Sequence, residues 1–281
     1  MATTVSLINM KGGVGKSTLT VNLAWHFAGY SLAWAKKVLV IDLDPQFNAS
    51  QYLLGVKGYE KILNDGKPMV WDIFEQFTQV PGKTRKPLKI EEVIRPIKSW
   101  SDGARIDLIP SSLELAFSLR NPGQKDRLLE LALRPVKDNY DLILIDCPPT
   151  DSVFTTAAYL SSNFVVVPVK PEYLSSIGLP LLVNSMNTFA NEYPDNQLDL
   201  AGVIFNGTSG YSPEENLSKK DVTTISNKNG WYIFKNEVPF SRSFPKGARE
   251  GEPLFRTSYR RSKKAGQFAA VAEEFAKQVG L

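Results

Sequence analysis

Short runs of β-branched and other apolar residues alternate along this chain with stretches of helical periodicity. The alternation is typical of a sheet covered by helices on both faces. The predicted strands lie near Val5–Asn9, Val38–Ile41, Ile106–Ile109, Leu142–Ile145, Phe164–Pro168, Gly202–Phe205 and Tyr232–Phe234, and the predicted helices cover Ser17–Ala28, Gln124–Val136, Val153–Leu160, Leu179–Phe189 and Ala265–Val279. Several strands are apolar throughout, as buried parallel strands should be. We therefore expect an α/β fold with a mostly parallel twisted sheet.

No internal repeat, low-complexity tract or Ser/Gly-rich linker divides the chain, so residues 1–281 are predicted to form a single domain. The segment 55–100 has weak periodicity and is rich in turn-forming residues around Pro81–Lys83 and Lys86–Pro87. We expect it to form short helices and loops at the periphery of the sheet. The final helix is amphipathic, and its apolar face is expected to dock on the sheet rather than on a lipid surface.

The scarcity of cysteine and histidine narrows the chemistry that the chain can perform. Cys147 is the only cysteine and His26 the only histidine. A disulfide within the chain is excluded, and thiolate clusters or histidine-based nucleophilic pairs are disfavoured. His26 is expected to be a surface or packing residue of its helix. No run of about 20 apolar residues is present and no charged leader precedes the first strand, so a cytosolic protein without membrane contact is expected.

A glycine-rich segment joins the first predicted strand to the first predicted helix. Gly12, Gly13 and Gly15 let the backbone turn tightly, so that successive N–H groups can face phosphate oxygens. The helix that begins near Ser17 adds its positive end to this cradle. Lys16 can place its ammonium on the β and γ phosphates, and the Ser17 hydroxyl stands where Mg²⁺ is normally ligated. The predicted nucleotide-binding segment is Lys11, Gly12, Gly13, Val14, Gly15, Lys16, Ser17 and Thr18.

The start of this segment departs from the general P-loop pattern. Met10 occupies the place of the first glycine, and Lys11 follows immediately. Here the chain resembles the deviant Walker A ATPases of the ParA/MinD type, a group of P-loop NTPases whose loop reads K-G-G-x-G-K-[ST]. In that family the first lysine reaches across a dimer interface to the partner's nucleotide, so the resemblance implies this role for Lys11 and a homodimer around ATP and Mg²⁺. A glycine-rich turn with solvated lysines would have the same local sequence.

Three aspartates at the ends of predicted strands extend the resemblance. Asp42–Asn48 resembles the family's D-x-D-P-Q-x-N segment, and Tyr140–Asp146 resembles its Walker B strand. The resemblance implies that Asp44 positions or activates the attacking water, that Asp42 supports the metal and phosphate region, and that Asp146 holds Mg²⁺ through a water. The predicted catalytic residues are thus Lys11, Lys16 and Asp44, and those at the metal are Ser17, Asp42 and Asp146. Two aspartates that cap a helix or a turn would also account for Asp42 and Asp44.

Two short segments, Gly202–Asn206 and Val238–Phe240, resemble the family's adenine pocket. Asn206 and Pro239 are the residues expected at the base, because the Asn206 amide can donate and accept hydrogen bonds together. Strands of this kind also occur without any ligand contact. No N-K-x-D segment for reading guanine is evident, and the preference for adenine is implied by the resemblance alone.

Positive charge is concentrated near the end of the chain. The formal net charge is +4, yet the stretch from Arg242 to Lys264 has eight basic and two acidic side chains, a local +6, so the remainder sums to −2. Such a patch can neutralise DNA phosphates without reading bases, with a salt-sensitive affinity. The predicted DNA-binding residues are Arg242, Lys246, Arg249, Arg256, Arg260, Arg261, Lys263 and Lys264. An ordinary solvated basic face would have the same composition.

The resemblance also implies a function. A ParA-type partition ATPase dimerises with ATP, binds DNA non-specifically, and hydrolyses ATP slowly when stimulated by a partner, thereby segregating a plasmid or chromosome. The implied partner is a ParB-like centromere-binding protein or a cargo adaptor, and the implied location is the nucleoid within the cytoplasm. Two alternatives stay open, a related ATPase that positions a protein cargo and a MinD-like switch at a membrane. An electron carrier like the nitrogenase iron protein would need two cysteines per subunit, which the chain lacks.

Overall fold

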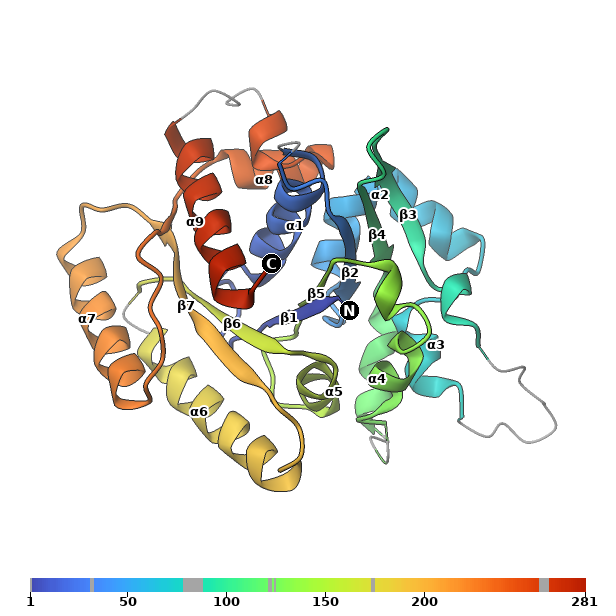
Figure 1. Ribbon diagram of the computed structural model, residues 1–281, viewed down its shortest axis with the longest axis horizontal. Coiled ribbons are helices and arrows are strands. Elements are labelled where there is room, and N and C mark those ends of the chain that lie inside the picture. Colours follow the sequence, from blue (N-terminus) through green and yellow to red (C-terminus); the bar gives the residue numbers. More distant parts are fainter. Residues whose placement is uncertain are drawn as a thin grey trace.

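The computed structural model describes residues 2–30, 33–77, 88–120, 123, 125–172, 175–257 and 263–281. They form a twisted central sheet between two layers of helices (Figure 1). The strands are β1 Thr3–Leu7, β2 Lys37–Asp42, β3 Arg95–Ser99, β4 Arg105–Ile109, β5 Leu142–Asp146, β6 Phe164–Val169, β7 Asp199–Thr208 and β8 Val238–Pro239. The α-helices are α1 Lys16–Trp25, α2 Asn48–Asn64, α3 Val70–Glu75, α4 Leu128–Leu133, α5 Val153–Ser161, α6 Ser175–Glu192, α7 Pro213–Lys228, α8 Ser243–Glu250 and α9 Lys263–Val279. The expected α/β fold is confirmed.

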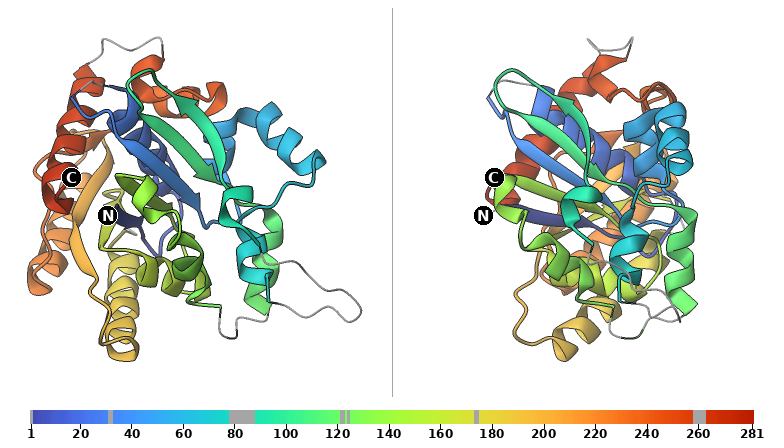
Figure 2. Two further views of the ribbon diagram at one scale, coloured as in Figure 1. Left: turned by 45° about the vertical axis from the view of Figure 1, so that its right-hand side comes forward. Right: turned by 90° about the vertical axis from the view of Figure 1, so that its right-hand side faces the viewer.

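The strand order across the sheet is β3-β4-β2-β5-β1-β6-β7-β8. Neighbouring strands are parallel except β3 and β4, which form an antiparallel hairpin at one edge (Figure 2). The register places Asp42 of β2 beside Asp146 of β5, with Leu7 of β1 on the other side of Asp146. Because these three strands are parallel, the loops that leave their carboxyl ends meet at one edge of the sheet.

The prediction of a strand at Tyr232–Phe234 was wrong. Only a single bridge joins this stretch to β7, and β8 takes the place at the edge of the sheet. The reason lies in the next two residues. The backbone N–H groups of Lys235 and Asn236 donate to the carboxylate of Glu274 on α9, at 2.7 and 2.9 Å, instead of continuing a ladder with β7.

The segment 55–100 contains more structure than was predicted. The expected short helices are present as the part of α2 that follows the kink at Gly55, as α3 and as a turn of 3-10 helix at Ile90–Glu92, but the strand β3 was missed. β3 carries Pro96 and lies at the edge of the sheet, where a missing backbone donor is tolerated. Its residues are half-buried or exposed, so it lacks the apolar alternation that predicts a strand.

Two apolar layers hold the helices to the sheet. On one face, alternate residues of β2 such as Val38 and Val40 pack with α1, α2, α8 and α9. On the other face, Leu39 and Ile41 pack with α3, α4, α5, α6 and α7. The central strands are buried on both sides, which explains why they are apolar without interruption.

Several helices differ from the prediction, and two of them, α7 and α8, bury few apolar residues. The helix predicted at Gln124–Val136 is confined to α4, and Gln124 lies outside the described residues. The helices α7 and α8, and the part of α2 before Gly55, were not predicted. In α7 the buried positions include Glu215, Ser218 and Ser226, with Val222 as the one apolar residue among them. A helix without an apolar stripe has no periodicity to detect.

His26 is a packing residue, as expected. It begins the π-helical turn His26–Tyr30 that follows α1, and only 2% of its surface is exposed. Its ring stacks on Tyr30 with centroids 4.9 Å apart and meets Phe27 and Phe268 edge-on. Neither ring nitrogen has a hydrogen-bond partner among the described residues. Burial lowers the pKa of His26 from 6.5 to about 4.

Replacing His26 with phenylalanine should remove an acid-sensitive part of the stability. The unfolded chain binds a proton at His26 below about pH 6.5, whereas the folded chain resists it until about pH 4. This contribution is therefore present at neutral pH and lost as the pH falls between these values. Between pH 7 and pH 5 the wild type should lose about 2 kcal/mol more free energy of unfolding than the variant. Urea titrations of both proteins at the two pH values measure this, and equal losses would contradict the argument.

The apolar face of α9 docks on the sheet, as expected. Phe268, Val271, Phe275 and Val279 are buried in the same layer as α1. An anchor of the MinD-like kind would need this face for lipid. Within the described ranges, no helix combines the length and the apolar character needed to span a bilayer.

Candidate nucleotide site

The loop between β1 and α1 borders a cavity of about 510 Å³. Gly13 and Gly15 adopt φ angles of 75° and 88°, a region that glycine enters without strain, and α1 begins at the next residue, Lys16. Six predicted residues of the loop line the cavity, namely Gly12, Gly13, Gly15, Lys16, Ser17 and Thr18. The start of α1 thus offers unpaired N–H groups and its positive end to a phosphate. A larger cavity of about 730 Å³ between α3 and α4 is lined mostly by apolar side chains and by none of the three predicted aspartates.

Lys16 is held against the backbone of the loop. Only 6% of its surface is exposed, and its Nζ donates to the carbonyl oxygens of Asn9 at 3.1 Å and Lys11 at 3.2 Å. Burial lowers the pKa of Lys16, while the nearby carboxylates of Asp146 and Asp44 raise it. A cation fixed in this way beside the cavity can meet phosphate oxygens with little reorganisation.

Asn206 at the end of β7 contacts the same loop. Its Nδ2 donates to the carbonyl oxygen of Val14 at 2.6 Å, and a Cβ at Gly15 would overlap this amide. The β7–β8 pairing brings Pro239 next to the end of β7. The structure therefore brings Asn206 and Pro239 together, although neither is among the described residues that line the cavity. Their contact with adenine stays a prediction.

Asp42 is buried at the end of β2 and holds the start of α2. Its Oδ2 accepts hydrogen bonds from the N and Oγ of Ser50, at 2.8 and 2.7 Å, and its Oδ1 accepts one from the N of Asp44 at 3.1 Å. Burial raises the pKa of Asp42 to about 7, although these hydrogen bonds oppose the shift. These contacts are those of an aspartate that caps a helix, the alternative reading of Asp42. The predicted support of the metal region by Asp42 stays a prediction.

Asp44 lies in the wall of the cavity, 7% exposed. Its Oδ1 accepts a hydrogen bond from the N of Gln46 at 2.9 Å. Burial raises the pKa of Asp44, while this hydrogen bond and the charge of Lys16 lower it. A carboxylate placed here can orient a water toward a phosphate that Lys16 holds.

Further residues of the cavity wall were not assigned from the sequence, among them Gln46, Asn48, Gln51 and Tyr52. The first two belong to the segment that resembles D-x-D-P-Q-x-N. Gln51 and Tyr52 follow Asn48 by three and four positions, so they share one face of α2. That spacing is the signal that could have found them. Ala248 adds α8 to the wall of the cavity.

Asp146 has the surroundings of a metal-binding carboxylate. It is fully buried at the end of β5, and neither of its carboxylate oxygens has a hydrogen-bond partner among the described residues. Burial raises the pKa of Asp146 well above its usual range and the charge of Asp42 adds to the rise, while Lys16 and the Ser17 hydroxyl, which lies close by without meeting the geometry of a hydrogen bond, oppose it. Unpaired buried carboxylate oxygens beside a serine hydroxyl fit Mg²⁺, which keeps several waters and is completed by substrate phosphates. A ready-made cluster of three acidic, histidine or cysteine ligands is not found in the described ranges.

The backbone of Lys11 is part of the loop, but its ammonium group lies elsewhere. Its Nζ lies 3.7 Å from Oε2 of Glu172, in the loop between β6 and α6, and Lys170 pairs with the same carboxylate. Gly178 of α6 is so close that a Cβ there would lie 3.3 Å from the Cβ of Lys11. Lys11 is not among the described residues that line the cavity. Its ammonium is therefore placed outside the cavity of its own chain.

The predicted DNA-binding residues differ in their surroundings. The helix α8 contains Lys246 and Arg249, and Arg242 immediately precedes it. The Arg249 side chain is 77% exposed. Arg256 and Lys264 are engaged within the chain, since the Arg256 guanidinium lies 5.0 Å from the ring centre of Trp25 and the Lys264 Nζ donates to the carbonyl oxygen of Phe240. Lys263 is exposed at the start of α9. Arg260 and Arg261 lie outside the described residues.

Known proteins of similar sequence place the chain in a family. Residues 2–200 match the family described as an AAA domain. The sporulation initiation inhibitor protein Soj of Bacillus subtilis is 30% identical over 258 residues, which cover 90% of this chain and 90% of Soj. The virulence plasmid ParA family protein pGP5-D of Chlamydia psittaci is 32% identical over 206 residues, which cover 72% of this chain and 68% of that protein. The chain belongs to the ParA/MinD family of P-loop ATPases.

Solved structures share the fold of this ParA-type ATPase. Apo McdA of Cyanothece superposes with a TM-score of 0.76 at 19% identity, covering 98% of this chain and 99% of McdA. A plasmid partition protein of Borrelia burgdorferi bound to AMPPNP gives 0.72 at 23% identity, covering 99% and 100% of the two chains. Cobyrinic acid a,c-diamide synthase of Mycobacterium smegmatis with ADP and magnesium gives 0.69 at 20% identity, covering 97% and 93%. Nucleotide hydrolysis is the general activity of the family to which this ParA-type ATPase belongs.

Proposed function

We propose that this ParA-type ATPase forms a homodimer with ATP and Mg²⁺, binds DNA without sequence preference in that state, and leaves the DNA after slow hydrolysis. The proposed stimulus is a ParB-like centromere-binding protein or a cargo adaptor, and the proposed outcome is segregation of a plasmid or chromosome. The protein would act in the cytoplasm on the nucleoid, without membrane contact. Residues 1–281 are proposed to act as one domain.

The position of Lys11 is the observation that carries this proposal. Its backbone is part of the phosphate loop, whereas its Nζ lies by Glu172, outside the cavity. A lysine that is anchored in the loop but directed away from its own cavity is suited to reach a nucleotide held by a second copy. If both copies do so, the interface exists only while nucleotide is bound, and hydrolysis ends it.

The other site residues would have separate roles in nucleotide binding and in hydrolysis. Lys16 and the N–H groups of the loop would hold the phosphates, and Asp44 would orient the attacking water. Mg²⁺, bound through Ser17 and Asp146, would supply charge neutralisation at the β and γ phosphates. Asn206 and Pro239 are proposed to receive the adenine.

The contact of α8 with the cavity supports a link between nucleotide and DNA. Ala248 lines the cavity, while the same short helix carries the exposed Arg249 and the half-buried Lys246, each 3.9 Å from Oε1 of Glu250. A change at the nucleotide can therefore reach the basic helix directly. A protein cargo handled by the same nucleotide site is the second candidate, favoured by the engagement of Arg256 and Lys264 within the chain.

The test is binding to a random-sequence duplex, measured over a range of salt concentrations without nucleotide, with ADP and with ATP. We expect the wild type to bind the duplex tightly only when ATP is present, with an affinity that falls as salt increases. Lys11→Ala should not bind the duplex even with ATP. When the logarithm of the affinity is plotted against the logarithm of the salt concentration, the slope should be smaller in magnitude by about 1 for Arg249→Ala. This is the contribution of one phosphate contact. Arg134→Ala, which removes a comparably exposed arginine after α4, is the matched control. Binding that ignores the nucleotide would exclude the DNA-riding mechanism and favour a protein cargo.

A further inference from the structure

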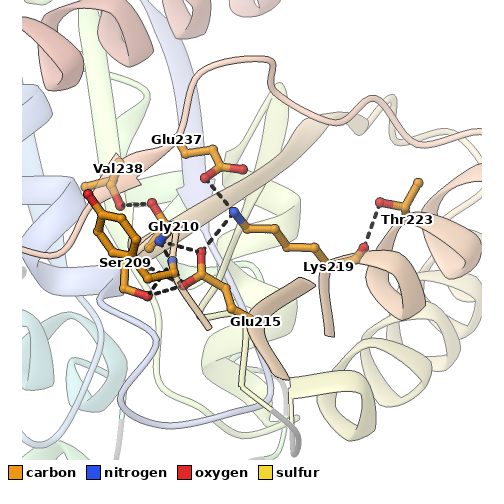
Figure 3. A network of polar contacts seen from close by, with 9 residues as sticks. Ser209, Gly210, Glu215, Lys219, Thr223, Glu237 and Val238 are labelled. Atoms are coloured by element: carbon orange, nitrogen blue, oxygen red, sulfur yellow. Dashed lines mark hydrogen bonds and ion pairs between the residues drawn. The ribbon is translucent and has the colours of Figure 1, made fainter. Parts of the chain in front are cut away.

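A buried carboxylate on α7 holds the loop that follows β7 (Figure 3). Glu215 is 6% exposed, and its Oε2 accepts hydrogen bonds from the N and Oγ of Ser209 at 2.9 and 2.6 Å and from the N of Gly210 at 3.2 Å. Burial raises the pKa of Glu215, but its hydrogen bonds with Ser209 and Lys219 bring it down to about 2. The carboxylate is therefore ionised at neutral pH.

Lys219, one turn later on α7, connects this carboxylate to the segment that enters β8. Its Nζ lies 2.9 Å from Oε1 of Glu215 and 2.7 Å from Oε2 of Glu237, which immediately precedes β8 (Figure 3). The same ammonium lies 5.6 Å from the ring centre of Phe205 on β7. One cation thus joins the two strands whose ends carry Asn206 and Pro239.

The contacts of Glu215 are not those of a helix cap. Ser212–Glu215 has the S-x-x-E sequence of a capping box at the start of α7, in which the glutamate would accept from the backbone of Ser212. In the described part of the chain, Glu215 instead reaches past Ser212 to Ser209 and Gly210, and the Ser212 side chain makes no capping hydrogen bond. The carboxylate therefore orders the loop rather than the helix end.

A third residue on this face of α7 holds another loop of the site. Ser218 Oγ donates to the carbonyl oxygen of Glu172 at 2.9 Å, and Glu172 is the residue beside Lys11. Glu215, Ser218 and Lys219 are spaced three and four positions apart, so they share one helix face. These three side chains are polar although they are buried or half-buried, and each contacts a different segment near the nucleotide site.

We propose that Glu215 and Lys219 are positioning residues that hold the segments carrying Asn206 and Pro239 in the geometry that receives the adenine base. The proposal rests on the base site described under the proposed function. Buried ion pairs add little net stability compared with apolar packing, but their directional contacts fix orientation. The phosphate loop has contacts of its own through Lys16, and the hydrogen bond from Asn206 to the Val14 carbonyl oxygen is what joins it to the end of β7, so the two side chains should act mainly on the base end of the nucleotide.

Calorimetric titration of Glu215→Gln and Lys219→Met with ATP, ADP and inorganic tripolyphosphate, each with Mg²⁺, tests the proposal. Tripolyphosphate occupies the phosphate loop without a base. We expect both variants to bind ATP and ADP about 10-fold more weakly, the effect of losing one charged hydrogen bond, and tripolyphosphate within about twofold of the wild type. Glu214→Gln and Lys220→Met make the same changes at exposed neighbours on α7 and should leave all three affinities unchanged.

Two results would overturn the positioning role, either unchanged affinity for ATP in both variants or an equal loss for ATP and tripolyphosphate. The second would mean a general structural effect. The proposed base site has a separate test. If the wild type binds tripolyphosphate as tightly as ATP, the base adds nothing to the affinity, and the proposed base site is wrong. If circular dichroism shows that Glu215→Gln is unfolded, Lys219→Met and Ser209→Ala carry the test, since each removes a partner of Glu215 and keeps its carboxylate.

Discussion

Replacing Lys16 with alanine should weaken ATP binding by about 1000-fold, enough to abolish it at ordinary concentrations. The Lys16 ammonium is buried beside the cavity and is tied to the carbonyl oxygens of Asn9 and Lys11. Its loss would remove the cation proposed to face the phosphates, and would leave the carboxylates of Asp146 and Asp44 without the nearby positive charge. Both effects oppose an anionic ligand.

Isothermal titration with ATP and Mg²⁺ measures the loss, with Lys57→Ala as the control. Lys57 is exposed on α2, and its removal should leave the affinity unchanged. Circular dichroism should show that Lys16→Ala is folded, because most of the core lies away from the loop. A folded Lys16→Ala protein that bound ATP as well as the wild type would show that the cavity is not the phosphate site.

Replacing Asp44 with alanine should slow ATP hydrolysis by about 100- to 1000-fold while leaving ATP affinity within a few-fold of the wild type. Asp44 lies in the cavity wall, where its carboxylate could orient the attacking water, whereas Lys16 and the loop are proposed to hold the phosphates. Since hydrolysis would end the proposed dimer, the variant should form a long-lived dimer with ATP.

Single-turnover hydrolysis and light scattering after gel filtration measure these two effects. Glu60→Ala, which removes an exposed carboxylate from α2, should behave as the wild type in both. An Asp44→Ala protein that hydrolyses ATP at the normal rate would remove Asp44 from the mechanism. A variant that loses ATP binding instead would assign Asp44 to the support of the phosphates.

Elements with a continuous apolar run or an apolar stripe were predictable, whereas β3 and α7, which have neither, were missed. The strands near Val38–Ile41 and Leu142–Ile145 were predicted because they are apolar throughout. The edge strand β3 contains Pro96 and is partly exposed, and α7 buries Glu215 and Ser218 in place of an apolar stripe. The strand predicted at Tyr232–Phe234 failed for a different reason, since a side chain on a distant helix takes the backbone donors that follow it.

The sequence by itself determined the phosphate loop, because the turn, its glycines, Lys16 and the start of α1 are neighbours in the chain and need only local geometry. It also placed Asp42 and Asp146 at strand ends. Only the tertiary structure decided what these groups contact. The sheet order and register put the two aspartates side by side, and the packing of α6 and α7 brings Glu172 to Lys11 and the Glu215–Lys219 pair to the segments beside Asn206. Such contacts join residues far apart in the chain, and hydrogen bonds and ion pairs act only over a few ångströms, so no local pattern could specify them.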